Sequence, residues 1–590
     1  MFDWPNIFSA KAIAIDIETR DNQLKALGCG AERGDGFIVG MALAADGLPP
    51  FYLPLRHPTG NLDRAQVTAY LEHQLGKFTN TLVFANGGYD LRWLNKEGIH
   101  FPNAHYRDVM TADCLLDERN FSYGLDAMAM RYGLGGKAEL DKKDKQRMDE
   151  LPAEVVAPYA CRDVELTLAI HKLQEPLIKR HDLEKVMALE DALLPVLVRM
   201  SRRGVRIDRA KLEEIDAKAK AKVEEELSTL ADMAGQEVTI PKLRKPTFLA
   251  DMVKHVTGVV LPKTPSGRPA TDKATLLTIK HPLIDHLQTA KQALKISNDF
   301  CGGVREHLVG DRLHVTFHAT KSQNQSDETY GVGVGRLSCT DVNLQQSPVR
   351  HPEWGPLWRS VFIADEGKQF ISADFSSQEQ RMAIHLATKL RIPGGYAFAE
   401  RWRKDPTLDI HQAVADLCKI KRSEAKTISL GILYGMGGGK LARSLGLPTE
   451  MKEYNGRRFE GAGPEAQKLL DIYHERFPAF RGLLRHYSDE AKKFGVVRSI
   501  MGRLFHLEDY ESFRAVNRVV QGSAADQMKT AMVLADRAGL ELQLSVHDEC
   551  CMSGYVNDGL LLKEIMETAM FLAVPSVVEV ARGRDWSCKC

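Results

Sequence analysis

Two carboxylates near the start of the sequence, Asp16 and Glu18, follow a short apolar run over residues 12–17. We predict a buried strand there that ends at the two acids. Because side chains on a strand alternate, both carboxylates would lie on one face. Neighbouring carboxylates repel each other unless cations lie between their oxygens, so the pair could bind divalent metal ions. Taken alone, so short a pattern is better explained as a solvated surface pair.

Two further motifs place an acid where a metal site could use it. Asp90 ends the sequence NGGYD, at a predicted junction between a strand and a helix. In YACRD, Tyr159 precedes Asp163 by four residues, which puts a phenol and a carboxylate on one helix face. Asp108 and Asp113, in DVMTAD, are better explained as structural acids.

Two aspartates in the second half of the chain have the context that phosphoryl transfer requires. Asp374, in FISADFSSQEQR, follows an apolar strand. Asp548, in LSVHDE, lies where one alternating run stops and another begins, which predicts the tip of a β-hairpin. Carboxylates at two separate strand ends could bridge two metal ions.

A basic stripe lies between these aspartates. Arg422, Lys426, Leu430 and Tyr434 recur every four residues, so they share one face of a predicted helix. Two cations one turn apart near the start of a helix suit a triphosphate. Taken alone, the pattern is better explained as an amphipathic surface helix.

The elements around these residues divide the chain into differently patterned regions. Strands and helices alternate over about 170 residues, which predicts an α/β domain. The pattern is helical from Pro176 to about Gln236 and mostly helical over 380–510. Residues 360–373 and 540–555 are predicted to form strand pairs.

The composition is that of a globular protein with no overall attraction for nucleic acid. Its 590 residues exceed one domain, and 44% hydrophobic with 27% charged residues exclude a disordered chain. With 79 Lys+Arg against 78 Asp+Glu, the net charge is +1, so a nucleic-acid binder would need local basic grooves. The ten cysteines form no CxxC pair, which fits a reducing compartment. We expect a cytoplasmic protein without a membrane partner.

The acidic motifs of the first half resemble those of the proofreading 3′–5′ exonuclease domain of DNA polymerases. DIET, NGGYD and YACRD occur in the order of that domain. The resemblance implies a site in which metal ions activate a water and stabilise the departing 3′ oxygen. Two divalent ions would be held by Asp16, Glu18, Asp90 and Asp163, and Tyr159 would orient the water.

The second half resembles DNA polymerase family A, the group of bacterial DNA polymerase I and many phage replicases. The resemblance extends from about residue 12 to Trp586, and R-x3-K-x7-YG followed by VHDE is a specific combination. The matching segments, in the family's order, are VGRLSCTDVNLQQSPVR (334–350), DFSSQEQR (374–381), DIHQAV (409–414), RSEAKTISLGILYG (422–435), QGSAAD (521–526) and VHDE (546–549).

This resemblance implies a role for each matching residue. The polymerase site would hold two Mg²⁺ ions on Asp374, Asp548 and the Phe375 carbonyl, with Glu549 as a supporting catalytic acid and His547 beside the DNA. Glu379 would be the steric gate that excludes a ribose 2′-hydroxyl. The other implied contacts are His411, Arg422 and Lys426 with the triphosphate, Tyr434 beside the templating base, and Arg336 and Gln521 in the minor groove.

The sequence departs from the family at three of these places. Leu430, on the nucleotide-binding helix, stands where most members carry an aromatic residue. Ser377-Gln378-Glu379 replaces the usual Gln-Ile-Glu, and Phe375 replaces a tyrosine.

The implied architecture is an α/β exonuclease domain of the RNase H-like type followed by an α+β polymerase domain shaped like a right hand. We place the exonuclease domain at 1–175 and the polymerase domain at 176–590. Within the latter, we expect the thumb at about 205–310, the palm at about 311–385 and 512–590, and the fingers at about 386–511.

We therefore predict a monomeric, DNA-dependent DNA polymerase that extends a primer on template DNA with deoxynucleoside triphosphates and proofreads it. A phage replicase is favoured, because of the size of the chain and because no 5′-nuclease domain is expected. A host or organellar repair-type polymerase is the main alternative. Glu379, VHDE and the exonuclease motifs argue against a single-subunit RNA polymerase. An intact acid set argues against an inactive DNA-binding scaffold, since a binder gains nothing from desolvating paired carboxylates. Whether a helicase–primase or a clamp acts as a partner is left open by the sequence.

Overall fold

The computed structural model describes residues 4–141, 143–320, 333–348, 351–454 and 457–589. The chain forms two compact units, each built from several segments. The first comprises Met1–Gly204, Thr316–Thr340 and Ile371–Arg582, and the second comprises Val205–Val315, Asp341–Phe370 and Gly583–Cys590. Among the described helices, none is both long and apolar enough to cross a membrane.

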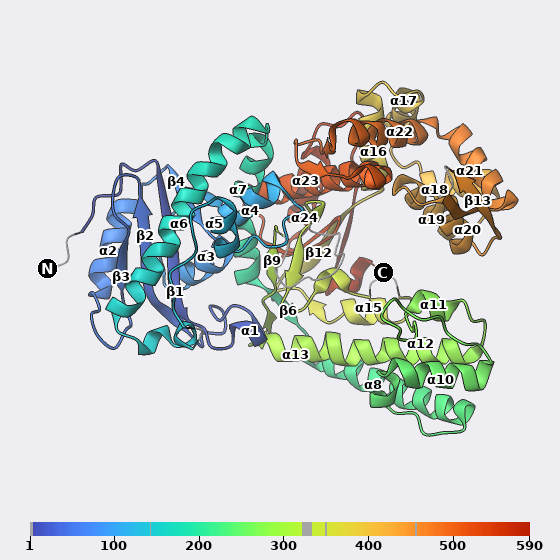
Figure 1. Ribbon diagram of the computed structural model, residues 1–590, viewed down its shortest axis with the longest axis horizontal. Coiled ribbons are helices and arrows are strands. Elements are labelled where there is room, and N and C mark those ends of the chain that lie inside the picture. Colours follow the sequence, from blue (N-terminus) through green and yellow to red (C-terminus); the bar gives the residue numbers. More distant parts are fainter. Residues whose placement is uncertain (1–3, 142, 321–332, 349–350, 455–456, 590) are drawn as a thin grey trace. The chain divides into compact units, whose positions relative to one another are not determined.

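The N-terminal sheet has the strand order β3-β2-β1-β4-β5 (Figure 1). Its central strand β1 pairs antiparallel with β2 and parallel with β4. The strands are β1 (Ala12–Arg20), β2 (Phe37–Ala45), β3 (Phe51–Pro54), β4 (Thr81–Phe84) and β5 (His105–Asp108). The strand predicted for 12–17 is thus confirmed and extends past both acids.

The two faces of β1 differ in side-chain size, and this decides where the acids lie. Ile13, Ile15 and Ile17 pack into the core shared with α2 (Arg64–Leu75) and α3 (Gly87–Lys96). Ala12 and Ala14 pack instead with residues of α6 (Ala153–Arg180). Because Asp16 and Glu18 continue the alanine face, they lie on the side of the sheet that α6 covers.

Helix α6 begins earlier than the helical pattern suggested from sequence, and it contains both Pro158 and Pro176. It is followed by α7 (Glu184–Arg203) in the first unit and α8 (Arg209–Ala234) in the second. Tyr159 and Asp163 therefore sit on a long, continuous helix, one turn apart.

The second sheet of the first unit has the order β17-β18-β12-β19. Its strands are β12 (Gln369–Phe375), β17 (Leu542–Val546), β18 (Glu549–Gly554) and β19 (Val578–Gly583). Val546 pairs with Glu549, so His547 and Asp548 form the tip of the hairpin, as predicted. The helices α16 (Gln378–Lys389) and α23 (Ala515–Arg537) pack against each other beside this sheet.

The region 380–510 is mostly helical, as predicted, but it also contains two hairpins. Its helices include α17 (Gly395–Lys404), α18 (Ile410–Cys418), α19 (Arg422–Leu433), α21 (Pro464–Arg476) and α22 (Pro478–Phe494). The hairpins are β13–β14 (Thr449–Tyr454 and Arg457–Ala462) and β15–β16 (Val496–Arg498 and Leu504–His506). The strand TEMKEY has no apolar alternation, and Met451 is 68% exposed, so periodicity could not reveal it.

The second unit is built on long helices and a small sheet. Its main helices are α8, α10 (Pro246–Thr257) and α12 (Pro282–Lys295), whose apolar faces form one core. The sheet has the order β11-β6-β8-β7, from β6 (Val205–Ile207), β7 (Leu308–Val309), β8 (Arg312–Leu313) and β11 (Phe362–Ile363).

Candidate active sites

The four acids of the first motif set come together beneath α6. Asp16 and Glu18 lie on β1, Asp90 in the first turn of α3, and Asp163 on α6. Burial and the neighbouring Asp163 carboxylate raise the pKa of Asp16 to about 7. Burial and then the charges of Asp16 and Asp163 raise the pKa of Glu18. Burial and the charges of Asp16 and Glu18 likewise raise the pKa of Asp90, so the four acids lie within electrostatic range of one another.

These acids fit a site for divalent cations. Glu18, Asp90 and Asp163 are buried, and each has one oxygen without a hydrogen-bond partner among the described residues. A buried, unpartnered carboxylate oxygen is costly in a protein, whereas hard divalent cations bind such oxygens well. The donor set therefore suits Mg²⁺-like ions.

Tyr159, which the sequence predicts to orient water, lies at the edge of this cluster with a cation that sequence reasoning missed. Lys137 forms an ion pair with Asp163, and its Nζ lies 5.0 Å from the centroid of the Tyr159 ring. Burial alone would lower the pKa of Lys137, but the Asp163 charge raises it, so the side chain is an ammonium at neutral pH. No motif surrounds Lys137 in the sequence, so no local signal could have identified it.

Asp108 and Asp113 have the structural roles predicted for them. Asp108 caps α4 (Val109–Leu116) by accepting from Met110 N at 2.8 Å, and it accepts from Gly87 N at 2.8 Å. Asp113 accepts from the Tyr132 hydroxyl at 2.9 Å. Both carboxylates are satisfied by the protein itself.

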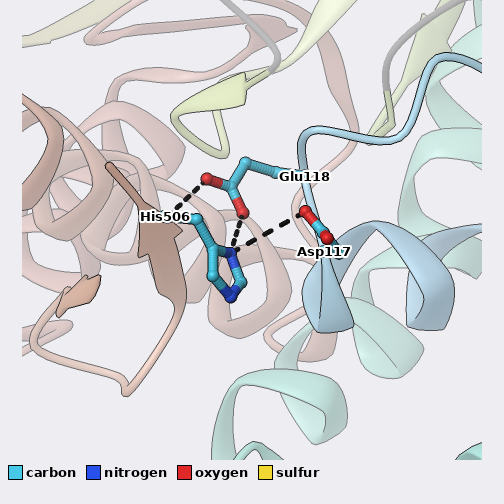
Figure 2. A group of neighbouring side chains, drawn as sticks. All are labelled: Asp117, Glu118 and His506. Carbon is cyan, nitrogen blue, oxygen red and sulfur yellow. Dashed lines mark hydrogen bonds and ion pairs between the residues drawn. The ribbon is translucent and has the colours of Figure 1, made fainter. Parts of the chain in front are cut away.

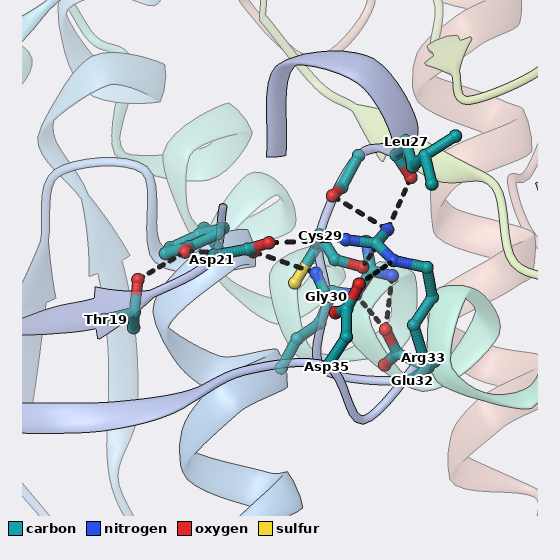
Figure 3. A network of polar contacts seen from close by, with 11 residues as sticks. Thr19, Asp21, Leu27, Cys29, Gly30, Glu32, Arg33 and Asp35 are labelled. Carbon is teal, nitrogen blue, oxygen red and sulfur yellow. Dashed lines mark hydrogen bonds and ion pairs between the residues drawn. The ribbon is translucent and has the colours of Figure 1, made fainter. Parts of the chain in front are cut away.

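A polar network at the end of β1 joins Asp21 to Gly30 and Arg33 of the following loop (Figure 3). The Asp21 carboxylate accepts from Gly30 N at 2.9 Å and from the Tyr89 hydroxyl at 3.3 Å. Thr19 and Tyr89 share a hydrogen bond of 2.6 Å between their hydroxyls. Because Tyr89 precedes Asp90, these contacts hold Glu18 and Asp90 in register across the site.

The second acid pair lies at neighbouring strand ends of the β17-β18-β12-β19 sheet. Phe375 N donates to the Asp548 carbonyl at 3.1 Å, so the end of β12, with Asp374, lies against the tip of the β17–β18 hairpin. Glu549 is turned into the sheet, where its Oε1 accepts from Ser372 Oγ at 2.5 Å. His547 is exposed at the tip, with a φ of +58°. Two acids at adjacent strand ends can share metal ions.

Four residues predicted for nucleotide and DNA contacts, Glu379, Tyr434, Arg336 and Gln521, form one cluster. The Tyr434 hydroxyl donates to Glu379, and Arg336 forms an ion pair with the other oxygen of the same carboxylate. Burial and then the Glu379 charge raise the pKa of Tyr434, whereas a hydrogen bond with Gln521 opposes this. Tyr434 therefore donates its proton to Glu379, so Tyr434 and Arg336 both bind the carboxylate of the predicted gate.

The cations of the basic stripe lie on α19, as predicted. Arg422 is exposed and ion-pairs with Asp409 at 2.7 Å, a partner that the stripe itself did not reveal. Asp409 also caps α18, accepting from His411 N at 2.8 Å. Burial lowers the pKa of His411 to about 4, so its imidazole is neutral at physiological pH. Lys426 is exposed and Leu430 is partly buried one turn further along.

A third cluster, of Asp117, Glu118 and His506, has ligand atoms within 4.8 Å of one another (Figure 2). Glu118 accepts from His506 N at 2.6 Å and pairs with the imidazole Nδ1 at 2.9 Å. These hydrogen bonds account for the grouping, so we assign it as a contact between the segment after α4 and strand β16.

Comparison with known proteins yields two family matches. Residues 7–178 match a 3′–5′ exonuclease family, and residues 209–588 match DNA polymerase family A. The chain is 38% identical to the DNA-directed DNA polymerase of Pseudomonas phage M6, over 99% of this chain and 95% of that protein. It is 28% identical to DNA polymerase DpoZ of Vibrio phage phiVC8, over 88% of each chain.

More distant similarities agree with these matches. DNA polymerase I of Pseudomonas aeruginosa is 28% identical over 98% of this chain and 63% of its own length. The fold is similar to a solved structure, the POL domain of Pol1 from M. smegmatis in complex with DNA primer-template and dNTP. That structure has a TM-score of 0.79 and 22% identity, and the match covers 99% of this chain and 97% of that one.

Proposed function

The chain belongs to DNA polymerase family A and carries a 3′–5′ exonuclease domain, and from this premise we propose that it replicates phage DNA on a primer–template. The observation that carries the proposal is the presence of two separate acid sites: four acids beneath α6, and Asp374 with Asp548 at neighbouring strand ends. Membership of DNA polymerase family A argues against the RNA polymerase, and the intact set of acids argues against the inactive scaffold. Similarity to the phage enzyme over 95% of its length favours a replicase over a repair enzyme.

Both kinds of domain use divalent metal ions. We propose Mg²⁺, two ions in each site, held by Asp374, Asp548 and the Phe375 carbonyl in one and by the four acids in the other. Bound ions would neutralise charge on the reacting phosphate.

The protein's own residues supply substrate binding in the polymerase site. Arg422 and Lys426 lie one turn apart on α19 and would bind the triphosphate of an incoming deoxynucleotide. His411, neutral at pH 7, would add a hydrogen bond rather than a charge. Arg336 and Gln521 would contact the primer–template in the minor groove, where acceptors are nearly the same for all base pairs. We propose that the enzyme acts as a monomer in the cytoplasm, which for a phage protein is that of the bacterial host.

The test separates the two activities on a labelled primer with Mg²⁺, with and without nucleotides. Asp16→Ala with Glu18→Ala should abolish trimming of the primer and leave extension nearly unchanged. Asp548→Ala should abolish extension and leave trimming. Loss of both activities in either variant would refute the assignment of two independent sites.

A further inference from the structure

Two lysines lie on the ring of Tyr159, at the edge of the exonuclease acids. Lys137 Nζ is 5.0 Å and Lys145 Nζ is 4.8 Å from the centroid of that ring. Lys137 also forms an ion pair with Asp163, whereas Lys145 is exposed on the short helix Asp144–Gln146. Lys137 therefore contacts both the Tyr159 ring and one of the acids.

The backbone around Lys137 is fixed from two helices. Lys137 N donates to Asp126 Oδ1 at 3.1 Å, from α5 (Leu125–Arg131). Arg162 on α6, the neighbour of Asp163, donates to the Leu134 carbonyl at 2.7 Å and to the Gly136 carbonyl at 3.4 Å. The helix that carries Tyr159 and Asp163 therefore also positions Lys137, which is how a preorganised cation is built.

The charge balance of the site calls for such a cation. Asp16, Glu18, Asp90 and Asp163 bring four negative charges, which two divalent ions would cancel. The phosphodiester next to the 3′ end adds a further negative charge, which grows as water attacks. The Lys137 side chain is 25% exposed, so its ammonium is accessible from solvent although it pairs with Asp163.

We propose that Lys137 is a further catalytic residue of the exonuclease site, whose ammonium binds the phosphodiester next to the 3′ end of the strand. The hydrolysis joins a water oxygen to phosphorus, breaks the bond from phosphorus to the 3′ oxygen of the preceding nucleotide, and leaves one water proton on that oxygen. Lys137 stays an ammonium throughout and binds the non-bridging oxygens. The inference rests on the exonuclease function and deepens it.

The first experiment measures single-turnover trimming of a single-stranded oligonucleotide with Mg²⁺. Lys137→Met should slow trimming at least about tenfold, whereas Lys137→Arg should stay within about threefold because the charge is kept. Lys143→Met is the matched control, since Lys143 is exposed in the same stretch and contacts neither Tyr159 nor the acids in the described part of the chain. Primer extension should be unchanged in all three, which shows that each variant folds.

The outcomes separate this inference from the assignment of the site. Trimming by Lys137→Met at the wild-type rate would overturn the inference, and so would faster trimming, because Lys137 would then be only a counter-ion that metal displaces. Trimming that survives in Asp16→Ala with Glu18→Ala would instead refute the exonuclease site itself.

A binding measurement tests the contact without hydrolysis. In an Asp16→Asn, Glu18→Gln background, a strand with 2-aminopurine at its 3′ end is titrated by fluorescence, with either a phosphate or a neutral methylphosphonate as its last linkage. In the protein that keeps Lys137, the methylphosphonate strand should bind at least about fivefold more weakly than the phosphate strand. In the Lys137→Met protein, the two strands should bind equally. Equal losses in both proteins would show that Lys137 does not touch this linkage.

Discussion

At position 430 the chain carries a leucine on the face of α19 that also carries Lys426, one turn before Tyr434. A hydroxyl at this place could replace the hydrogen bond that a missing 3′-OH would make, and leucine has no polar atom. We therefore expect the enzyme to discriminate against dideoxynucleotides. Leu430→Tyr should raise their incorporation at least about tenfold, or roughly 1.4 kcal/mol in the transition state.

The measurement is the ratio of dideoxy to deoxy incorporation in the Asp16→Ala, Glu18→Ala background, where trimming cannot hide the result. Leu430→Phe serves as the matched control, because it adds the ring without the hydroxyl. Equal ratios for leucine and tyrosine would mean that residue 430 does not contact the sugar.

The predicted sugar gate, Glu379, is tied to Tyr434 and Arg336. Glu379→Ala should admit ribonucleotides, because it opens space where a 2′-hydroxyl would lie. Glu379→Gln keeps the volume and an acceptor for Tyr434, so it should still exclude them. Relative use of ribo- and deoxynucleotides in primer extension tests this. A glutamine variant as permissive as the alanine variant would assign the selection to charge rather than to size.

At the scale of elements, helix α7 is joined to α23 by buried charges. Glu190 on α7 lies 2.6 Å from Lys529 Nζ and 2.5 Å from Arg503 Nη2, and Arg503 also pairs with Asp526 at 2.8 Å. Glu190→Gln removes the carboxylate that pairs with the buried Lys529, so it should destabilise the protein by about 3–5 kcal/mol.

Removing the pair instead of one partner should be far less costly. In Glu190→Met with Lys529→Met, Arg503 keeps Asp526, and we expect most of the lost stability to return. Thermal unfolding of both variants is the measurement. A double variant as unstable as Glu190→Gln would show that packing, not charge, joins these helices.

The contact of β1 with α6 has a pH dependence of its own. Burial and Asp163 raise the pKa of Asp16 from its ordinary 3.8 to about 7, so folding favours the protonated acid. The stability that this gives is present below pH 4 and is lost as the pH rises through 7. With EDTA at pH 8, Asp16→Asn should therefore melt several degrees higher than wild type, and the difference should shrink toward pH 5.

Divalent ions should reverse this order, because they need the charged acid. With Mg²⁺ at pH 8, the wild-type melting temperature should rise more than that of Asp16→Asn. If the two proteins differed by the same amount at both pH values and in both buffers, the buried-acid account would be wrong.

At the scale of the whole molecule, the exonuclease segment after α4 contacts the polymerase part through Glu118 and His506. Glu118→Ala leaves a backbone N–H and an imidazole of His506 without their acceptor, which should cost about 1–3 kcal/mol. Arg119→Ala is the control, since its exposed pairs should contribute less than about 1 kcal/mol. Thermal melting compares them, and equal effects would show that this contact does not stabilise the molecule.

Local geometry predicted the positions of several side chains of both candidate sites. The period of two along β1 puts Asp16 and Glu18 on one face, and the period of 3.6 along α19 aligns Arg422 with Lys426. The tip of the β17–β18 hairpin, with Asp548, followed from two alternating runs that meet there. These features depend on a few consecutive residues, so the sequence alone determined them.

Only the tertiary structure decided which distant side chains meet. Glu379 pairs with Arg336, 43 residues away, and with Tyr434, 55 residues away. Lys137 reaches Asp163 only because α5 and α6 fix its backbone. Such pairs have no period or spacing along the chain, because they arise from the packing of whole elements against one another. The sequence by itself therefore determined which acids share a strand face or a hairpin tip, and the fold decided which cations and hydroxyls they contact.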